Sequence, residues 1–330
     1  MQVVFVRHLF QLATLLLAFL CPQMSLAQAS ILSEQLRDCA QIENEGERLH
    51  CYDALTKRAD SQMLEKGSYL ERRWELDESQ ARGRFTLIPH RDNYLMPLTY
   101  NGNRYHPAGG LEYPVKDVDS QEVKYQISLK TKLWQDVLGE NLDLWFAYTQ
   151  KSFWQLYNFA ESAPFRETNY EPELLLNLRL KKKLLGVYLR TLVLSVNHQS
   201  NGRSEPLSRS WNRLVAALGF ERGAFSMVLK GWYRIPEGRD NDDNPNIDDY
   251  LGLGEIQSYF RWRKHRFGLL LRNNFQSHHN RSSFLFDWSF PLMQKIGLYL
   301  QYFNGYGENL LDYNQYANRI GIGFILMDWD

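Results

Sequence analysis

Beyond residue 30, the chain lacks any apolar run of the roughly 18 residues that a membrane-spanning helix requires. It also lacks an excess of charge of either sign, because 38 Lys and Arg residues balance 38 Asp and Glu residues. Balanced charge provides neither a basic surface for nucleic acid nor an acidic tail. The mean hydropathy of -0.46 resembles that of a soluble protein. A membrane β-barrel is still compatible with these absences, because its strands alternate lipid-facing and lumen-facing residues.

The first 27 residues have the pattern of a cleaved signal peptide. Arg7 supplies a positive charge, residues 12–20 form a short apolar run, and Ser25 and Ala27 place small residues at a cleavage position. This order is typical of secretory signal peptides. A single anchoring helix is the alternative, but the run is short and Pro22 interrupts it. We expect the segment to be removed and the mature chain to be exported.

Cysteine is scarce, with only three residues in the whole chain. Cys21 lies within the N-terminal segment, where the preceding residues make a poor lipidation site. Cys39 and Cys51 remain in the exported protein. Two cysteines in an oxidising compartment usually pair, so we expect a disulfide between them, with two free thiols as the alternative.

The region before residue 85 predicts a small helical extension and a linker. Apolar residues repeat at helical spacing over residues 32–40 and 49–55, and Gly46 separates the two stretches. Residues 28–60 are therefore expected to form a helical hairpin. Residues 61–84 are charged and aperiodic, which predicts a linker.

From Phe85 the pattern changes to a period of two. Leu174, Leu176 and Leu178, for example, form one apolar face opposite Asn177. About twelve such segments follow, and single-chain outer-membrane barrels require an even number. We therefore expect an all-β fold over residues 85–330, a twelve-stranded antiparallel transmembrane β-barrel. The expected strands are 85–100, 124–137, 141–157, 171–181, 183–197, 211–220, 224–235, 249–263, 265–276, 282–290, 294–304 and 318–328.

Short and long connections alternate along these strands, which supports the barrel. Outer-membrane barrels have tight periplasmic turns and longer extracellular loops. A large soluble β-sandwich also has alternating strands, but it explains this asymmetry less well. The expected short turns are 138–140, 182, 221–223, 264 and 291–293, and the expected longer loops are 158–170, 198–210, 236–248, 277–281 and 305–317.

Three polar side chains are expected to converge on the lipid-facing side of adjacent strands. His198 and Ser200 follow the fifth strand and share the parity of its apolar face. If the strand continues, their Cα atoms lie about 6.6 Å apart, two residues of strand rise. Asn212, on the sixth strand, shares the parity of Leu214. This placement brings the three side chains together at the lipid boundary.

Such a cluster has the chemistry of a nucleophilic triad. Ser200 would be the nucleophile, His198 the base, and Asn212 the residue that orients the imidazole. A neutral amide costs less to hold against hydrocarbon than an ionised carboxylate. Gly202 would bring its N–H close to a developing oxyanion. The alternative is that these residues only bond to backbone at a strand end, because such pairs also occur by chance.

Longer motifs surround these residues and resemble a known family. The sequences NHQSNGRS at 197–204 and SRSWNR at 208–213 resemble the active-site signature of the outer-membrane phospholipase A family of Gram-negative bacteria. The resemblance extends from about Phe85 to the C-terminus. Further matches are YTQKS at 148–152, FRETNYEP at 165–172, DDNP at 242–245 and GYGE at 305–308.

The resemblance implies a calcium-dependent enzyme that hydrolyses acyl esters of phospholipids and lysophospholipids. It implies His198 as base, Ser200 as nucleophile and Asn212 as the orienting residue. The protein would lie in the outer membrane, with its active site toward the outer leaflet, and would be active as a homodimer.

The resemblance also implies a calcium site and a dimer contact. The Ser208 hydroxyl, the Arg203 carbonyl and the partner's Ser162 would bind the ion. Waters on the ion, with the Gly202 amide, would stabilise the oxyanion. Gln150 would bridge the dimer interface. Calcium accepts such flexible oxygen ligation.

Some features depart from the family pattern or have simpler interpretations. Glu205 replaces an expected Asp, and the terminal aromatic residue, Trp329, is followed by one more residue. His278 and His279 are expected to be solvated, because other metal ligands are scarce nearby. The acidic stretch 240–249 is interpreted as a solvated turn, with a calcium site as the alternative.

The competing function is a passive channel or a structural barrel. About twelve strands leave a narrow interior that side chains fill, which argues against a wide pore. Positional specificity between the two acyl esters, headgroup preference, the trigger for dimerisation and the role of the N-terminal hairpin stay open from the sequence.

Overall fold

The computed structural model describes residues 36–65, 69–77, 81–103, 115, 117–238, 242–293 and 295–326. The expected signal peptide and the C-terminal aromatic residue lie outside these ranges. The chain divides into two compact units, residues 1–66 and residues 67–330. No helix in the described ranges is both long enough and apolar enough to span a membrane.

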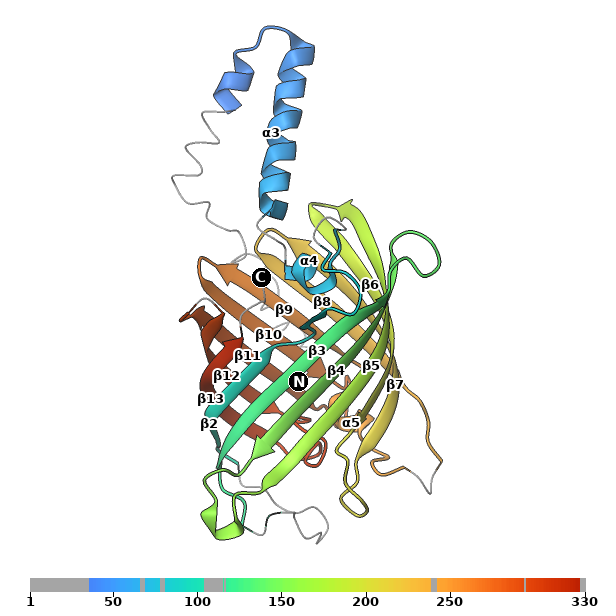
Figure 1. Ribbon diagram of the computed structural model, residues 1–330, viewed down its shortest axis with the longest axis vertical. Coiled ribbons are helices and arrows are strands. Elements are labelled where there is room, and N and C mark those ends of the chain that lie inside the picture. Colours follow the sequence, from blue (N-terminus) through green and yellow to red (C-terminus); the bar gives the residue numbers. More distant parts are fainter. Residues whose placement is uncertain are drawn as a thin grey trace. The chain divides into compact units, whose positions relative to one another are not determined.

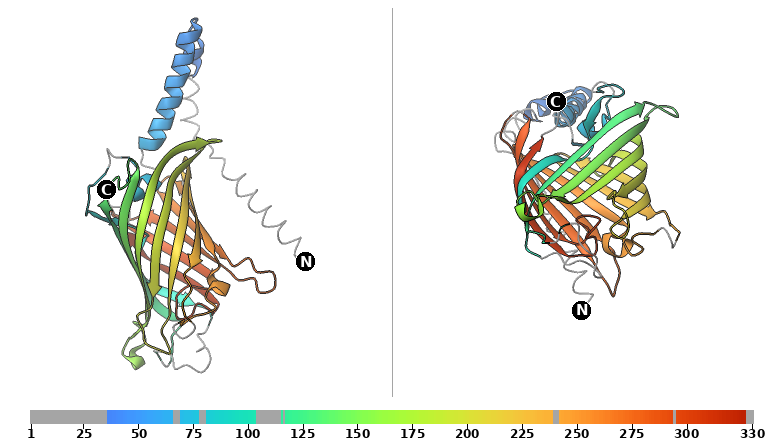
Figure 2. Two further views of the ribbon diagram at one scale, coloured as in Figure 1. Left: turned by 90° about the vertical axis from the view of Figure 1, so that its right-hand side faces the viewer. Right: turned by 60° about the horizontal axis from the view of Figure 1, so that its bottom comes forward.

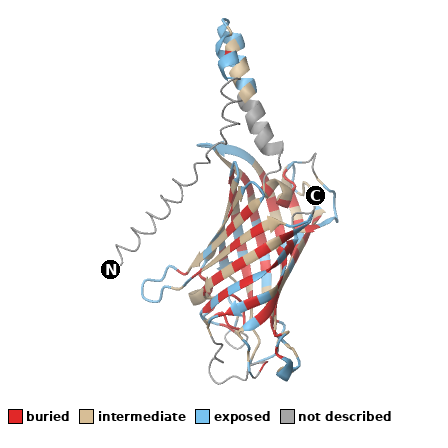
Figure 3. Ribbon diagram, turned by 90° about the vertical axis from the view of Figure 1, so that its left-hand side faces the viewer, coloured by how far each residue is buried: buried red, intermediate tan, exposed pale blue. Residues whose placement is uncertain are grey.

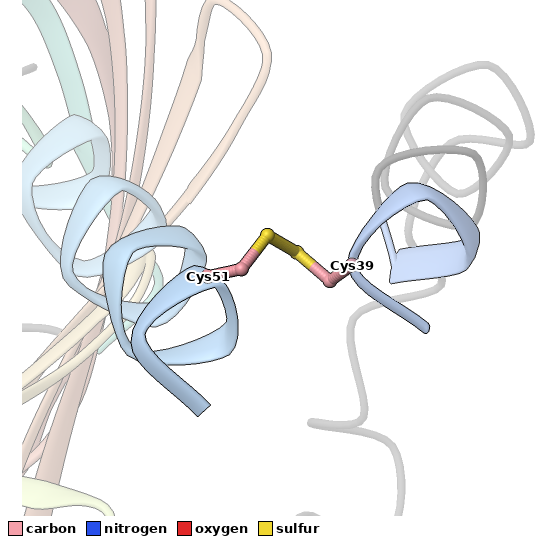
Figure 4. Close-up of a disulfide and its surroundings, with 2 residues drawn as sticks. All are labelled: Cys39 and Cys51. Atoms are coloured by element: carbon pink, nitrogen blue, oxygen red, sulfur yellow. A yellow bond between two sulfur atoms is a disulfide. The ribbon is translucent and has the colours of Figure 1, made fainter. Parts of the chain in front are cut away.

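The first unit contains a short helical segment, residues 36–40, and helix α3 (Glu45–Glu65). A disulfide joins Cys39 to Cys51 with the Cα atoms 5.6 Å apart (Figure 4). The break between the two helices was expected at Gly46, but it lies at residues 41–44. Asn44 explains the shift, because its side-chain oxygen accepts hydrogen bonds from the free N–H groups at the start of α3.

The second unit is a closed antiparallel β-barrel of twelve strands, β2 to β13, which confirms the predicted fold class (Figure 1). Each strand pairs with its neighbours in sequence, and β13 pairs with β2 to close the sheet. The strands are β2 (Asn93–Asn101), β3 (Gln121–Trp134), β4 (Leu142–Trp154), β5 (Phe165–Leu184), β6 (Val187–Ser200), β7 (Ser210–Arg222), β8 (Phe225–Arg234), β9 (Gly254–Trp262), β10 (His265–Asn273), β11 (Ser282–Pro291), β12 (Ile296–Gly305) and β13 (Ala317–Leu326).

The first expected strand, 85–100, is interrupted in the structure. A short strand β1 (Leu87–Pro89) and β2 both pair along β3, and residues 90–92 bulge between them. Pro89 has no N–H to donate. Arg91 and Asp92 in the bulge make ion pairs with charged side chains of the barrel wall, at 2.7 and 2.8 Å. Arg91 and Asp92 therefore place charged groups in the barrel interior.

Buried and accessible residues alternate along much of the barrel wall (Figure 3). In β5, Leu174 and Leu178 are accessible, whereas Glu173 and Asn177 are buried. The interior is polar and the outer surface is apolar, as in membrane barrels. Ion pairs fill this interior; one example is Glu122, which lies 2.5 Å from Arg166 and 2.8 Å from Arg319.

Helix α4 (Tyr69–Trp74) lies within one end of the barrel (Figure 1). The Leu70 N–H donates to Glu221 of β7 at 2.8 Å, and Arg73 pairs with Asp92 at 2.7 Å. The Trp74 ring lies under the Lys130 ammonium, 3.1 Å from the ring centre. Part of the stretch expected to be a linker is therefore ordered, because its charges find partners inside the barrel.

The connections have the asymmetry that was expected. Short turns join β5 to β6, β7 to β8, β9 to β10 and β11 to β12 at the end that holds α4. Longer loops gather at the other end (Figure 2). Some boundaries differ. The strand expected over 171–181 extends over 165–184, and the strand expected from residue 249 begins at 254, because helix α5 (Asp248–Leu251) occupies its first positions.

Candidate active site

Two of the expected site residues are in direct contact. β6 and β7 pair antiparallel with His198 opposite Asn212. The His198 Nδ1 and Asn212 Oδ1 atoms lie 2.8 Å apart, within hydrogen-bond distance. Ser200 lies two residues further along β6 and therefore on the same face. The structure thus brings His198 and Asn212 together and places Ser200 beside them on the strand.

This face is the outer surface of the barrel. Leu194 and Val196, which share the parity of His198, are 50% and 54% exposed, and Leu214 beside Asn212 is 49% exposed. Apolar side chains at this exposure face lipid in a membrane barrel. The cluster therefore lies where the lipid-facing surface meets the longer loops.

β6 continues further than expected. The loop predicted to start at residue 198 starts at 201, because Ser200 still pairs with Ser210 of β7 and with Tyr170 of β5. Both catalytic candidates on β6 are therefore held by a three-strand backbone ladder. A site on strands is positioned more rigidly than one on a loop.

Asn201 organises the loop after β6. Its side chain is buried and donates to the Leu207 carbonyl oxygen at 2.9 Å, while its own oxygen accepts from the Arg209 N–H at 3.0 Å. The Arg203 guanidinium donates to the Arg166 carbonyl oxygen at 2.7 Å, which ties the loop to β5. The residues between 201 and 209 thus have a defined backbone path.

Gly202 occupies a position that only glycine fits well. Its φ of +65° is a left-handed conformation that L side chains rarely adopt. A Cβ atom there would lie 3.0 Å from the Tyr170 ring. The absent side chain leaves the Gly202 backbone accessible directly after the strand that carries Ser200.

The acidic stretch 240–249 was interpreted as a solvated turn, but its described part contacts the site. The Ser208 hydroxyl donates to the Asp243 carboxylate. The Ser210 N–H donates to the buried Asn244 side chain at 2.9 Å. The interpretation was wrong for these residues, because their partners lie more than 30 residues earlier, in the β6–β7 connection and at the start of β7. No local sequence pattern indicates such contacts.

Further charges anchor the same loop. Arg234, at the end of β8, pairs with Asp242 at 2.6 Å. Burial raises the pKa of the Asp248 carboxyl in α5 above its ordinary value, although the Arg234 guanidinium opposes the shift. Because the Arg234 guanidinium also lies 4.0 Å from the Asp248 carboxylate, it holds the loop at both Asp242 and Asp248.

Glu237, an acidic residue that the sequence did not indicate, contacts the cluster directly. The Asn212 side-chain N–H donates to the Glu237 carboxylate at 2.9 Å. The two residues are 25 positions apart in sequence, and Glu237 follows β8 in a connecting segment without periodicity. Only the pairing of β7 with β8 brings them together.

The remaining candidates lie elsewhere on the barrel. Ser162 ends the short 3-10 helix Phe159–Glu161 and is exposed in the β4–β5 loop, apart in sequence from Arg203 and Ser208. Gln150 lies on β4, where its side chain donates to the Ser152 hydroxyl at 3.3 Å.

The possible metal ligands in this region are mainly neutral oxygens. Within the described part of the chain, no three His, Cys, Asp or Glu side chains gather closely enough to hold a metal ion. His278 and His279 are exposed. The oxygen donors near the cluster are the Arg203 carbonyl and the Ser208 hydroxyl, with Asp243 beside the latter.

Comparison with known proteins agrees with the fold. The family model for phospholipase A1 matches residues 70–326. The phospholipase A1 of Escherichia coli strain K12 is 37% identical over 244 residues, which cover 74% of this chain and 82% of that protein.

Solved structures show the same likeness. The outer membrane phospholipase A of Escherichia coli aligns with a TM-score of 0.69 at 37% identity, over 77% of this chain and 95% of that one. The outer membrane phospholipase of Salmonella typhi, a dimer with bound calcium, aligns with a TM-score of 0.68 at 37% identity, over 76% and 95% of the two chains. The family resemblance seen in the sequence is confirmed. This chain belongs to the phospholipase A1 family of Gram-negative outer-membrane enzymes.

Proposed function

We propose that this chain hydrolyses acyl esters of phospholipids and lysophospholipids in the outer leaflet, with Ser200, His198 and Asn212 as its catalytic triad. The observation that carries the proposal is the 2.8 Å contact between His198 and Asn212 beside Ser200, on the lipid-facing edge of two paired strands. A substrate that lies in the membrane reaches such a site without leaving the bilayer.

The chemistry divides into two transfers of the acyl group. His198 Nε2, the ring nitrogen turned away from Asn212, takes the Ser200 proton while Oγ attacks the ester carbonyl carbon. The tetrahedral intermediate collapses, the ester C–O bond breaks, and the leaving alcohol takes the proton from His198. Water, activated by the same histidine, then attacks the acyl-serine. This second step releases the fatty acid and restores Ser200.

Charge on the carbonyl oxygen needs a donor during both attacks. The Gly202 N–H is the candidate, because Gly202 lies two residues after Ser200, is exposed and carries no side chain of its own. Asn212 holds the imidazole in place. As a neutral amide at a lipid boundary it costs less to desolvate than an aspartate would.

Calcium is the cofactor we propose, and the residues present fit it. The Arg203 carbonyl, the Ser208 hydroxyl and the partner's Ser162 would bind the ion. Calcium accepts oxygen ligands of mixed type, and Asp243 adds negative charge within hydrogen-bond distance of Ser208. When bound, the ion would supply positive charge near the developing oxyanion. This ligand set requires a homodimer, and we propose Gln150 as a residue of its interface.

The test compares purified wild-type protein with Ser200→Ala in detergent micelles that contain phospholipid, with and without calcium. Wild type should release fatty acid, and the variant should lose at least about 10³-fold in rate. Circular dichroism should show the same folded barrel for both. Full activity in Ser200→Ala would disprove the triad, and conductance in a planar bilayer without lipase activity would favour a channel.

A further inference from the structure

Both ends of the Asn212 side-chain amide are engaged. Its oxygen lies 2.8 Å from His198 Nδ1, and its nitrogen donates to the Glu237 carboxylate at 2.9 Å. The three side chains form one continuous chain of hydrogen bonds. Asn212 and Glu237 are half-buried, whereas His198 is exposed. Glu237 therefore lies on the side of the amide that faces away from the reacting atoms.

The backbone holds Glu237 in this position. The pairing of β7 with β8 ends at Arg213 and Arg234, but the next residue of the chain extends the ladder, because the Ile235 N–H donates to the Asn212 carbonyl oxygen at 2.8 Å. Pro236 then restricts the backbone before Glu237. The backbone of the sheet therefore holds Glu237 within hydrogen-bond distance of the Asn212 side chain.

The carboxylate determines which way the amide points. An ionised carboxylate accepts hydrogen bonds and cannot donate them. The NH₂ group of Asn212 must therefore face Glu237, and its oxygen must face His198. An amide oxygen only accepts, so His198 Nδ1 carries the proton. Nε2 is left unprotonated, which is the state that a general base for Ser200 requires.

Without Glu237 the amide has no such preference. Turned end for end, it would present NH₂ to His198 and favour the tautomer with the proton on Nε2. That tautomer cannot take a proton from Ser200, and a wrong tautomer is costly in triad enzymes. The orientation of a neutral amide such as Asn212 therefore depends on the group that binds its other end, which here is Glu237.

We infer that Glu237 is a positioning residue of this site, which fixes the orientation of Asn212 and through it the tautomer of His198. The inference rests on the proposed triad. Glu237 also places a negative charge at the end of this chain of hydrogen bonds. The charge lies one hydrogen bond further from the imidazole than the carboxylate of an aspartate at position 212 would lie. That charge stabilises the imidazolium formed during each attack, while a neutral amide remains next to the histidine.

The first test compares Glu237→Ala with Glu237→Gln in the full-length enzyme, assayed on phospholipid in micelles. Glu237→Ala should lower kcat by roughly 10- to 100-fold, because the base is misoriented part of the time. KM should not change, because Glu237 lies behind Asn212. Glu237→Gln keeps an accepting oxygen and should recover kcat to within about threefold of wild type.

A matched control is Glu140→Ala, an exposed glutamate in the β3–β4 turn, which should leave kcat unchanged. Wild-type kcat in Glu237→Ala would overturn the inference. A KM increase with constant kcat would also overturn it, because it would place Glu237 in substrate binding.

A second test changes the charges at positions 212 and 237 without shortening either side chain. Asn212→Asp alone would set two carboxylates at hydrogen-bond distance, where they repel each other. Asn212→Asp combined with Glu237→Gln replaces that pair by a carboxylate that accepts from an amide. The double variant should be at least about tenfold more active than Asn212→Asp. A double variant no better than Asn212→Asp would overturn the inference.

The two proposals fail in different ways. Full activity in Ser200→Ala would remove the triad itself, whatever the Glu237 variants do. An inactive Ser200→Ala together with a fully active Glu237→Ala would leave the triad standing and remove only the role of Glu237. Circular dichroism of each variant confirms that the barrel is folded.

Discussion

Gly202 and Gly223 share a left-handed backbone conformation, with φ values of +65° and +57°, but they differ in their surroundings. A Cβ at Gly202 would press on Tyr170, whereas a Cβ at Gly223 would meet no atom within 4 Å. Alanine at either position should cost about 1 kcal/mol of stability. Only Gly202→Ala should also slow lipid hydrolysis, by roughly tenfold or more, because it displaces the proposed oxyanion donor. Assays of both variants check this, and equal rates would remove Gly202 from the oxyanion site.

At the residue scale, the sequence predicted those site residues whose position follows from strand parity. His198, Ser200 and Asn212 share the lipid-facing face that alternation assigned to them. Glu237 was missed, because its contact with Asn212 is made across the β7–β8 pair. Asp243 was noted only within a motif and an acidic stretch, because its contact with Ser208 joins two separate loops. Local patterns do not encode contacts that only a folded sheet creates.

At the scale of elements, α4 shows how a charged stretch becomes ordered. Leu70 is buried, and its methyl groups lie against Gly219 of β7. Leu70→Ala should cost about 2–4 kcal/mol, as truncation of a buried leucine does. Leu138→Ala, at a leucine that is 84% exposed in the β3–β4 turn, should cost less than about 0.5 kcal/mol. Thermal unfolding in detergent compares the two, and equal effects would mean that α4 is not part of the cooperative barrel.

The strands were predictable because a wall with lipid on one side and charge on the other imposes a period of two. The two helices of the second unit, α4 and α5, were not predictable. α4 is charged and short, and its order comes from partners such as Glu221 and Asp92 that lie far along the chain. Helix α5 occupies residues 248–251, where the start of a strand was expected and where the loop folds back against the site. Elements that depend on distant partners leave little periodic signal.

At the scale of the whole molecule, activity and stability should respond differently to calcium. The proposed ligands are loop oxygens and a residue of the partner, whereas the barrel is held by its own strand ladders and interior ion pairs. Removing calcium with a chelator should stop turnover and leave the thermal unfolding midpoint within a few degrees. Fatty acid release and circular dichroism on one sample measure both. Unchanged turnover in chelator would remove the metal from the mechanism.

The seam between β2 and β13 has a consequence for biogenesis. Tyr100, in the first barrel strand, pairs with Ile320 in the last. The chain that emerges first therefore has an unsatisfied strand edge until almost the whole polypeptide is available, and such an edge can pair with other chains. Closing so long a loop is also slow. A cell that makes this protein must keep the open edge of β2 from pairing with other chains until β13 is available, so the yield depends on protection of that edge as well as on the stability of the finished barrel.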